Sequence, residues 1–582
     1  TFTTSGLLGA LVPDASGNGN NWTNNNLNLS TSTATTYDQM KDTPSLVDTN
    51  AGNFAVINPL VGPSADTFSE GNLKIATSLS YAAFSHTRAT IGVSSGKWYW
   101  EVEWDAKSAT SAESCIGITT AVLNPYSQCI GQGAANVSYG YRNDAQKFSG
   151  GSISSYGATY TVGDVIGVAL DLDAGTLAFY KNGSAQGTAY SSISGTYFPG
   201  ISDVDNNTSR NSTFIANFGQ RPFAYTPPSG FLKLNTFNLP DSTIEKGDDY
   251  FNTVLYNGNG GTQSITGVNF QPDWTWIKGR NDAQYHVLQN SVTGAGKTLF
   301  SNTTTAETGN AGDFISSFDS DGFTVNNTYA GGTNNTVNGS GKTYVAWNWR
   351  AGSTTTNTAG SEDSVISANT TAGFSIVSYT GTGANMTIGH GLGAVPSVMI
   401  FKIRNSADNW AVWHNSFAVN QYVYLNNTTA KATVSTFMNG TLPTSTLISL
   451  GTWATVNYTA SHNYIAYCFA EVPGYSSFGS YTGNGSADGP FVYTGFRPAF
   501  LLCKRADGGT GNWQLFDNKR LGYNLDNYGV QPNLSNAENT AQDLDILSNG
   551  FKHRQSGNDL NGSNTYIYMA FAENPFKNSN AR

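Results

Sequence analysis

The sequence is poor in charged residues and in cysteine. Asp, Glu, Lys and Arg make up only 12% of its 582 residues, about half of the roughly 25% that is usual in soluble domains. Its cysteines are Cys115, Cys129, Cys468 and Cys503, none in a CxxC motif, and they are too few for a disulfide framework. Cys468 and Cys503 lie in apolar runs and are predicted to be buried. Cys115 and Cys129 could form a disulfide, but their spacing does not decide this. Side-chain cores must therefore supply the stability.

Other absences exclude whole classes of function. The net charge of −10 leaves no basic surface of the kind that binds nucleic acid. We find no apolar run of about 18 residues, so no membrane insertion is expected. A charged segment followed by an apolar run is also missing, so we expect no signal peptide in this chain, which begins at Thr1. Helical periodicity is nearly absent.

Glycine and aromatic residues, in contrast, are abundant. The chain has 64 glycines, and 13% of its residues are aromatic, which excludes a disordered chain. Short alternating runs of β-branched and aromatic residues are separated by clusters of Gly, Asn, Asp and Ser, a pattern typical of strands and tight turns. The length suggests about four domains. We therefore predict an all-β protein of antiparallel β-sandwiches in tandem, jelly-roll-like in type, with very little helix.

The first part of the chain divides into an arm, a sandwich and a linker. Residues 1–54 are predicted to be an extended polar arm, residues 55–226 a β-sandwich, and residues 227–247 a linker marked by Pro227-Pro228. The sandwich is suggested by a series of motifs: GKWYWEVEW (96–104), CIGI (115–118), GDVIGVALDLDAGTLAFYKNG (163–183), YFPGIS (197–202) and IANFG (215–219). In order and spacing they resemble a SPRY domain. The resemblance implies two bent antiparallel sheets and a binding module without catalytic residues, whose ligand loops lie at one end.

The second half of the chain repeats one pattern three times. Each copy opens with a tyrosine and spaced glycines, at Tyr256, Tyr379 and Tyr481. An apolar strand then runs from a proline to a lysine, in the segments 272–278, 396–402 and 498–504. We predict three β-domains in tandem, at 248–352, 370–473 and 474–577, with each lysine ammonium group in water.

The threefold pattern is similar to a domain of unknown function found in phage and marine metagenomic proteins. There it often occurs in several copies, sometimes behind a SPRY-like module. The resemblance covers about residues 250–577 and implies a protein of the phage tail-fibre or virion-surface kind.

Four aromatic residues are candidates for ligand binding. Trp410, Trp413, Trp513 and Tyr285 could stack on sugar rings, although at least half of such rings should be in the core. Aligning the second strands by their terminal asparagines places His286 opposite Ala411 and Gln514, so no histidine recurs at matched positions. A catalytic or metal-binding histidine of the repeat is therefore not expected.

Metal and enzyme chemistry have little support. Asp14, Ser16 and Asn18 alternate oxygen-bearing side chains as calcium loops do, but the closing glutamate is missing. Asp319-Ser320-Asp321-Gly322 is interpreted as a turn. We expect no metal and no cofactor, and no nucleophile–histidine–acid arrangement is suggested. A pair of distant carboxylates for glycoside cleavage stays open.

These observations lead to one hypothesis and two alternatives. We expect a non-enzymatic structural protein of a bacteriophage virion, a tail fibre, spike or capsid decoration, that serves assembly and attachment to host-surface glycans. Its partners would be other virion proteins, copies of itself in a homo-oligomer, and a host glycan or receptor, and its location the extracellular virion surface. The alternatives are a lectin-like adhesin of a cell surface and, less favoured, a glycan-degrading tailspike enzyme.

Overall fold

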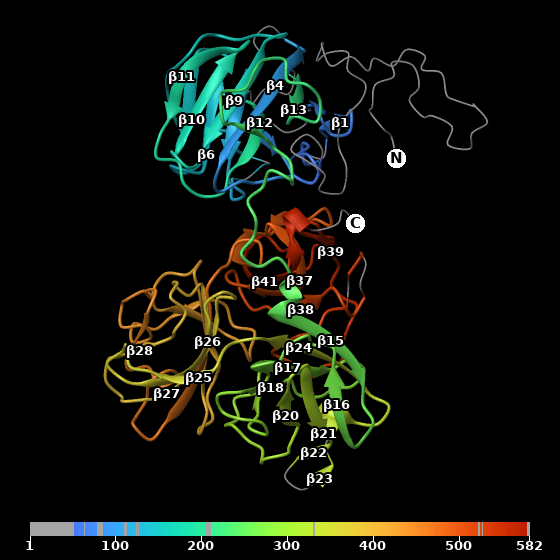
Figure 1. The fold of residues 1–582 in the computed structure, drawn as a ribbon, viewed down its shortest axis with the longest axis vertical. Coiled ribbons are helices and arrows are strands. Elements are labelled where there is room, and N and C mark those ends of the chain that lie inside the picture. The colour runs from blue at the N-terminus through green and yellow to red at the C-terminus, as the bar shows by residue number, and fades with distance from the viewer. Residues whose placement is uncertain are drawn as a thin grey trace, which may run out of the picture. The chain divides into compact units, whose positions relative to one another are not determined.

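The computed structural model is almost entirely β, which confirms the predicted fold class. It describes residues 52–578 except 63–64, 78–84, 110–112, 124, 126, 205–210, 330–331, 334, 522–523 and 527. In this part of the chain the helices are one α-helical turn, α1 (Asn335–Asn338), and two 3-10 turns, η2 (Gly247–Asp249) and η3 (Phe576–Asn578). No helix among these residues is long and apolar enough to cross a membrane. The chain forms two compact units that divide after Pro240 (Figure 1).

The first unit is a sandwich of two sheets that are antiparallel apart from one short parallel pair, β14 with β4. One sheet has the order β1-β2-β13-β4-β9-β10-β11, with β14 added to β4, and the other has the order β3-β12-β5-β6-β7-β8. The strands of the first sheet are β1 (Thr67–Ser69), β2 (Lys74–Ala76), β13 (Ser212–Asn217), β4 (Lys97–Lys107), β9 (Val165–Asp171), β10 (Thr176–Lys181), β11 (Ser184–Tyr190) and β14 (Leu232–Lys233). Those of the second are β3 (Ser85–Arg88), β12 (Phe198–Asp203), β5 (Ser114–Thr119), β6 (Ser138–Arg142), β7 (Gln146–Ser149) and β8 (Ser152–Ser155).

Aromatic side chains on alternating positions explain the sandwich. On β4, Trp98, Trp100 and Trp104 are each at most 1% exposed and lie on one face, because side chains alternate between the two faces of a strand. Tyr99 and Glu101 on the other face are buried as well. Asn182 and Gly183 join β10 to β11 with φ angles of 48° and 76°, the left-handed conformation that a tight hairpin of this type needs. The aromatic strand and the hairpin thus form as the sequence motifs predict.

The second unit contains the three repeats, and each repeat builds one main sheet around the same four strands. In repeat 1 they are β15 (Phe251–Asn257), β24 (Thr343–Trp349), β17 (Trp274–Gly279) and β18 (Val287–Asn290), with β19 (Leu299–Phe300) at the edge. In repeat 2 they are β27 (Phe374–Thr380), β34 (Asn463–Phe469), β29 (Val398–Ile403) and β30 (Ala411–His414), flanked by β25 (Thr354–Asn357), β26 (Ser364–Asn369), β31 (Gln421–Tyr424) and β32 (Ala432–Thr433). In repeat 3 they are β35 (Ser476–Thr482), β41 (Thr565–Pro575), β37 (Phe496–Arg505) and β38 (Trp513–Asp517).

A smaller sheet covers the outer face of each main sheet. It consists of β16 (Thr262–Thr266), β21 (Gly322–Asn326) and β20 (Ile315–Asp319) in repeat 1, of β28 (Met386–Gly389) and β33 (Leu447–Leu450) in repeat 2, and of β36 (Phe491–Tyr493), β40 (Gly550–His553) and β39 (Leu544–Leu547) in repeat 3. Repeat 1 adds the short hairpin of β22 (Thr328–Tyr329) and β23 (Gly332–Thr333). Each pair of sheets encloses an apolar cluster of its own repeat.

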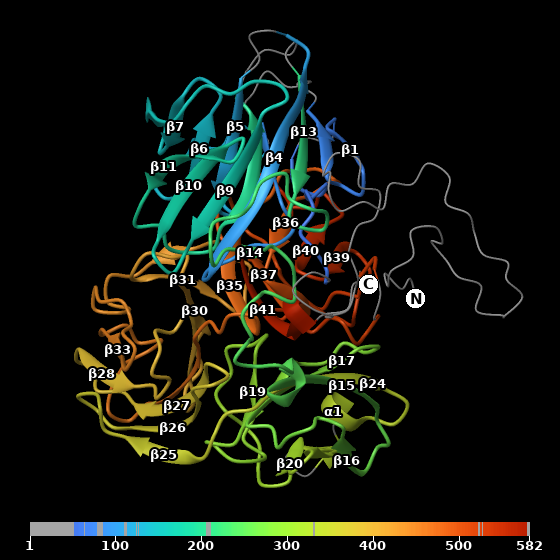
Figure 2. The same cartoon turned by 45° about the horizontal axis from the view of Figure 1, so that its top comes forward.

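The inner faces of the three main sheets meet in one shared core. This core contains large side chains from every repeat, among them Trp274, Trp347, Ile400, Tyr467, Leu502 and Met569. Figures 1 and 2 show the three groups of strands arranged around a common centre. The last aromatic residues of the closing strands, Trp349, Phe469 and Phe571, form a triangle with ring centroids 5.8 to 6.5 Å apart.

The repeats are therefore joined through their cores, and not only through the chain. The physical reason lies in their strands: β17, β29 and β37 have every residue buried, because one face packs on the small sheet and the other on the neighbouring repeats. Strands that are buried on both faces are largely apolar, which is why the Pro-to-Lys segments are mostly apolar, with Asp273, Thr275 and Ser397 as exceptions before the closing lysine.

Candidate functional site: the junctions of the repeat ring

The three repeated lysines are buried at the junctions between repeats. Lys278, Lys402 and Lys504 are each 0% exposed, so the prediction that their ammonium groups lie in water is wrong. Lys402 Nζ donates to the Thr304 carbonyl of repeat 1 at 3.2 Å, and Lys504 Nζ to the Thr428 carbonyl of repeat 2 at 3.2 Å. The neighbouring repeat covers the strand end that the sequence suggested would meet solvent.

Burial changes the ionisation of these lysines. It lowers the pKa of Lys278, Lys402 and Lys504 to about 8 each, because the ammonium ion loses its hydration. Backbone carbonyl groups replace part of that hydration. Lys278 Nζ donates to Gly279 O at 2.8 Å, and Lys504 Nζ donates to Gly511 O at 2.9 Å.

The same backbone contact recurs at all three junctions and closes the repeats into a ring. Glu307 N of repeat 1 donates to Arg404 O of repeat 2 at 2.6 Å. Lys431 N of repeat 2 donates to Ala506 O of repeat 3, and Glu538 N of repeat 3 donates to Arg280 O of repeat 1, both at 2.8 Å. Each repeat thus contacts the next, and the third contacts the first.

A second contact recurs with a different chemistry at each junction. Asn290, His414 and Asp517 occupy the same position, each cross-strand from the first core residue of its Pro-to-Lys strand. Asn290 Nδ2 donates to the Tyr467 hydroxyl at 3.1 Å, and Asp517 Oδ2 accepts from Trp347 Nε1 at 3.0 Å. A ring nitrogen of His414 lies 3.2 Å from Tyr568 O.

Charged side chains reinforce two of the three junctions. Arg404 binds Glu307 with two nitrogens of its guanidinium group, Nε at 2.8 Å and Nη2 at 2.9 Å. Arg280 binds Glu538 in the same way, at 3.0 and 3.1 Å. The junction between repeats 2 and 3 has Ala506 and Lys431 at these two positions, where such a pair cannot form.

The junction from repeat 3 to repeat 1 carries the most extensive charge network. Arg520 bonds Asp517 at 2.6 Å and Glu538 at 3.2 Å. Its guanidinium carbon lies 5.7 Å from the centre of a Trp347 ring. Since the side chains of Arg520 and Asp517 are 1% and 0% exposed, loss of either partner would leave a buried charge unpaired.

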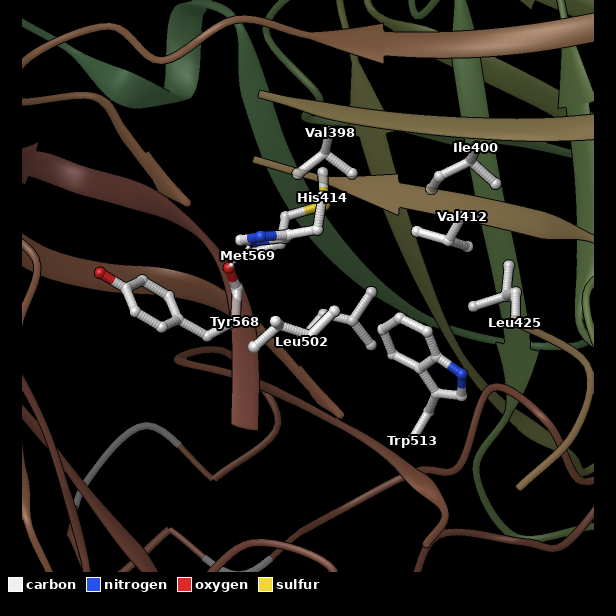
Figure 3. A pocket seen from close by; sticks show the side chains of 10 residues that line it. Val398, Ile400, Val412, His414, Leu425, Leu502, Trp513, Tyr568 and Met569 are labelled. Carbon is white, nitrogen blue, oxygen red and sulfur yellow. Dashed lines mark hydrogen bonds between the residues drawn. The ribbon is translucent and has the colours of Figure 1, made fainter. Parts of the chain in front are cut away.

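The junction between repeats 2 and 3 contains a small apolar cavity. Its lining includes Val398, Val412, Leu502, Trp513 and Met569. Figure 3 shows two ionisable residues beside them, His414 and Tyr568. The volume of about 10 Å³ is at the lower limit for one water molecule. Burial lowers the pKa of His414 to about 4, so this imidazole is neutral at pH 7. The cavity has no room for a ligand.

The predicted aromatic binding residues divide sharply by exposure. Trp410, Trp413 and Trp513 are 0%, 3% and 3% exposed, so none of these rings is presented to solvent, whereas Tyr285 is 48% exposed. Trp410 Nε1 donates to Phe300 O at 3.0 Å, and Trp513 Nε1 to Tyr424 O at 2.8 Å. Both of these tryptophans thus link their repeat to the preceding one.

The strand register corrects the sequence alignment at this position. Counted from the cross-strand pairs, His286 matches Trp410 and Trp513, and not Ala411 and Gln514. The alignment was one residue out because Asn290 ends its strand one position before Asn415 and Asn518. His286 is buried and accepts a hydrogen bond from Trp276 Nε1 at 2.9 Å. The same junction position is therefore buried in all three repeats, and it holds a tryptophan in two of them and a histidine in the first.

Of the two segments considered for metal binding, the structure describes one. Asp14, Ser16 and Asn18 lie outside the described residues. The Asp321 carboxylate accepts the N–H groups of Gly267 at 3.1 Å and Asn269 at 2.7 Å, in agreement with a turn. Among the residues that the structure describes, no three His, Cys, Asp or Glu side chains are grouped as metal ligands.

Sequence reasoning missed a buried asparagine in every repeat. Asn338, Asn457 and Asn561 are 0% exposed. Their side-chain oxygens accept the N–H groups of residues 259, 382 and 484 at 3.0, 2.7 and 2.9 Å. These amides fasten the glycine-containing loop that follows each opening tyrosine. Their signal was an asparagine five to seven residues before the tyrosine of each closing strand, at 344, 464 and 566.

The first unit gathers several connections at one end. Asp203 pairs with both Ser85 and Ser114, and Ser212 pairs with Lys107. The β2–β3, β4–β5 and β12–β13 connections therefore share one end of the sandwich. At this end Arg142 forms ion pairs with Glu113 at 2.9 Å and Asp144 at 3.0 Å.

Comparison with known proteins assigns both units. The family model described as "Domain of unknown function (DUF7483)" matches residues 246–575, more than half of the chain. The chain belongs to the DUF7483 family. A SPRY domain matches residues 97–220, which confirms the resemblance drawn from the motifs of the first unit. The DUF7483 match spans all three repeats, and its description assigns no activity.

Curated relatives match about a quarter of the chain. The chain is 32% identical over 160 residues to an E3 ubiquitin-protein ligase RKP of Arabidopsis thaliana, covering 27% of this chain and 12% of the relative. It is 26% identical over 159 residues to the ATP-dependent RNA helicase DDX1 of Xenopus laevis, covering 27% of this chain and 20% of the relative. The chain thus spans a fifth or less of these proteins.

Solved structures of SPRY domains also match part of the chain. The SPRY domain of human HERC1 is 17% identical, with a TM-score of 0.23, and the match covers 28% of this chain and 96% of that one. The TRIM65 PSpry domain is 17% identical, with a TM-score of 0.23 and coverage of 28% and 92%.

Proposed function

We propose that this protein is a non-catalytic attachment protein of a bacteriophage virion surface. In this proposal the SPRY sandwich binds a host-surface glycan or receptor through the connections at one end. The DUF7483 unit is a structural body that joins the SPRY domain to other virion proteins and to copies of this chain. The virion location rests only on the resemblance, drawn from the sequence motifs, of the threefold pattern to a domain of unknown function found in phage and marine metagenomic proteins.

The observation that carries the proposal is the use of reactive side chains inside the ring. The three lysines donate to backbone carbonyls, and the paired arginines and glutamates hold junctions together. The histidines at 286, 390, 414 and 553 are buried, and burial lowers the pKa of each. These lysines and histidines are closed off from solvent, so the unit is suited to contact.

Binding at the SPRY end can be tested on the full chain. We would measure binding to an array of bacterial surface polysaccharides for the native protein and for a variant with residues 204–211 replaced by a Gly-Ser segment of equal length. The matched control replaces residues 191–196, a connection at the opposite end of the sandwich. We expect the first variant to lose binding at least about tenfold, a change of about 1.4 kcal/mol, and the control to bind normally.

Three outcomes would contradict the proposal. Binding that survives in the 204–211 variant would remove the assigned surface. Release of reducing ends from a bound polysaccharide, abolished by one carboxylate substitution, would show an enzyme. Electron microscopy of purified phage particles in which no density fits this chain would remove the virion location and favour the cell-surface adhesin.

A further inference from the structure

A small apolar cluster of the first unit contains two cysteines. Cys115 lies on β5 and Cys129 in the segment 127–132, which the structure describes in full and which forms no strand. Both side chains are 0% exposed and both thiols are free. The cluster also contains Leu123, Ile130, Phe148 and Val204.

The segment 127–132 crosses the second sheet of the sandwich. At one end the carbonyl oxygen of Gln128 lies 2.8 Å from Nδ1 of His86 on β3. At the other end Gly131 N donates to Ser138 Oγ on β6 at 2.8 Å. Because β12 and β5 lie between β3 and β6 in this sheet, the residues between 128 and 131 pass over these two strands.

Two observations place Cys115 beside this crossing. Ser202 Oγ on β12 donates to Cys115 O at 3.4 Å and accepts from Ile130 N at 3.1 Å, so one hydroxyl group joins the two backbones. A Cβ atom at Gly140 would lie 2.2 Å from Cys115 Sγ and 3.0 Å from Ile130 Cγ2. The sulfur and the isoleucine therefore flank the same point, where a glycine leaves room for them. Cys129 is the residue directly before Ile130 and shares the cluster with Cys115.

The ionisation of the two thiols agrees with this proximity. Burial raises the pKa of Cys115 well above its usual value, and the nearby Cys129 raises it further. Burial also raises the pKa of Cys129 to about 12. Both groups are therefore protonated at neutral pH, and they react only when the segment 127–132 opens, because the thiolate is the nucleophile in thiol chemistry.

The other two cysteines of the chain provide an internal comparison. Cys468 and Cys503 are also 0% exposed. They belong to two separate apolar clusters, one inside repeat 2 and one inside repeat 3. Cys115 and Cys129 are thus the two cysteines of this chain that share a cluster.

We propose that Cys115 and Cys129 form a disulfide when the chain meets a low-molecular-weight disulfide such as oxidised glutathione. The thiolate of one cysteine attacks a sulfur of the oxidised glutathione and releases one glutathione thiolate. The thiolate of the second cysteine then attacks the mixed disulfide, which forms the Cys115–Cys129 bond and releases the second glutathione. The two cysteines lose two electrons and two protons, and two glutathione thiols carry them away. This inference does not rest on the function proposed above.

The bond would fasten the segment 127–132 to β5. It would close a loop of about 15 residues, a constraint that mainly restricts the unfolded chain and so stabilises the folded one. Val204, the first residue after β12, belongs to the same cluster. The bond would therefore stabilise the sandwich near the end at which β12 leads into its connection to β13.

Thiol counting on the full chain tests this inference. The reduced protein is incubated with oxidised glutathione in urea below the unfolding transition, then denatured and labelled with iodoacetamide. We expect the free thiols to fall from four to two, with one linked pair of peptides that contain residues 115 and 129, and reduction should restore all four. The melting temperature of the first unit should be about 6–12 °C higher in the oxidised sample.

Alanine variants provide the controls, since alanine keeps these buried positions apolar. Cys115→Ala and Cys129→Ala should each give no linked peptides, whereas a chain with both Cys468→Ala and Cys503→Ala should give the same linked pair as the native chain. Peptide mapping of the native chain decides the inference even where a variant fails to fold. Four free thiols after oxidation, a mixed disulfide with glutathione that persists in the native chain, or a link that includes Cys468 or Cys503 would each overturn it.

Discussion

At the scale of single residues, the buried lysines show how a polar group can hold an apolar core together. Lys402 and Lys504 each reach a carbonyl of the preceding repeat, so their ammonium groups act across a junction. Their burial also has a cost, because removing an ammonium ion from water disfavours its charged form. This cost appears in the lowered pKa of about 8.

The lowered pKa predicts how stability depends on pH. Between pH 8 and the ordinary lysine value of 10.5, the unfolded chain binds more protons than the folded chain. The free energy of unfolding should therefore rise with pH in this window. Urea unfolding should give a free energy of unfolding that is larger at pH 9.5 than at pH 8 by on the order of 1 kcal/mol per lysine. Both pH values lie below the ordinary tyrosine pKa of about 10, so tyrosines do not contribute. Lys402→Met should reduce the increase, and a fall in stability over this interval would contradict the assignment.

The aromatic candidates give a second prediction at this scale. Trp410→Phe removes the N–H donor to Phe300 O and should lower the free energy of unfolding by about 1–3 kcal/mol. Tyr285→Ala, at an exposed ring, should change it by at most about 0.5 kcal/mol. Chemical denaturation of both variants measures the difference. Equal losses would mean that Trp410 does not serve the junction.

Residue roles were only partly predictable from the sequence. The recurrence of Lys278, Lys402 and Lys504 marked them as important, and Cys468 and Cys503 are buried as predicted. The carbonyls that receive the lysines belong to other repeats, and no local pattern indicates which loop will cover a strand end.

At the scale of elements, the junctions use one backbone contact and three different sets of side chains. The Arg–Glu pair is present at two junctions and absent at the third, where Ala506 and Lys431 stand. This difference makes the third junction a place to test the pair directly.

Introducing the missing pair should follow double-mutant logic. Ala506→Arg alone places a second positive charge near Lys431 and should destabilise the protein. Combined with Lys431→Glu, it should recover stability, with a favourable coupling of about 0.5–3 kcal/mol. Thermal unfolding of the native chain, both single variants and the double variant gives the coupling. If the effects of the two substitutions simply add, the side chains at positions 431 and 506 do not pair in the way that Glu307 and Arg404 do.

The strands themselves were readily predicted, and their partners were not. Alternating and continuous apolar runs indicated β17, β29 and β37, and the Tyr-Gly segments indicated the loops after β15, β27 and β35. Pairing order and the shared core depend on contacts between segments far apart in the chain, such as Glu307 with Arg404, 97 residues apart, or Arg280 with Glu538, 258 residues apart. Such contacts leave no periodic signal in a single sequence.

At the scale of the whole molecule, the DUF7483 unit is one chain arranged as a ring of three similar parts. A ring formed within one chain allows each junction to diverge. One junction keeps a neutral histidine beside a small apolar cavity, and another has a polar cavity and a buried charge network. Identical subunits could not differ in this way, because symmetry would repeat every substitution.

The central claim, that the three repeats share one core, is tested most directly by hydrogen exchange on the full chain with Phe571→Ala. The ring centroid of Phe571 lies 5.8 Å from those of both Trp349 and Phe469. Its truncation should lower the free energy of unfolding by about 3–5 kcal/mol. We predict faster amide exchange in β24 and β34 of the other repeats as well as in β41, with the SPRY sheets unchanged. Faster exchange confined to residues 474–577 would contradict the shared core.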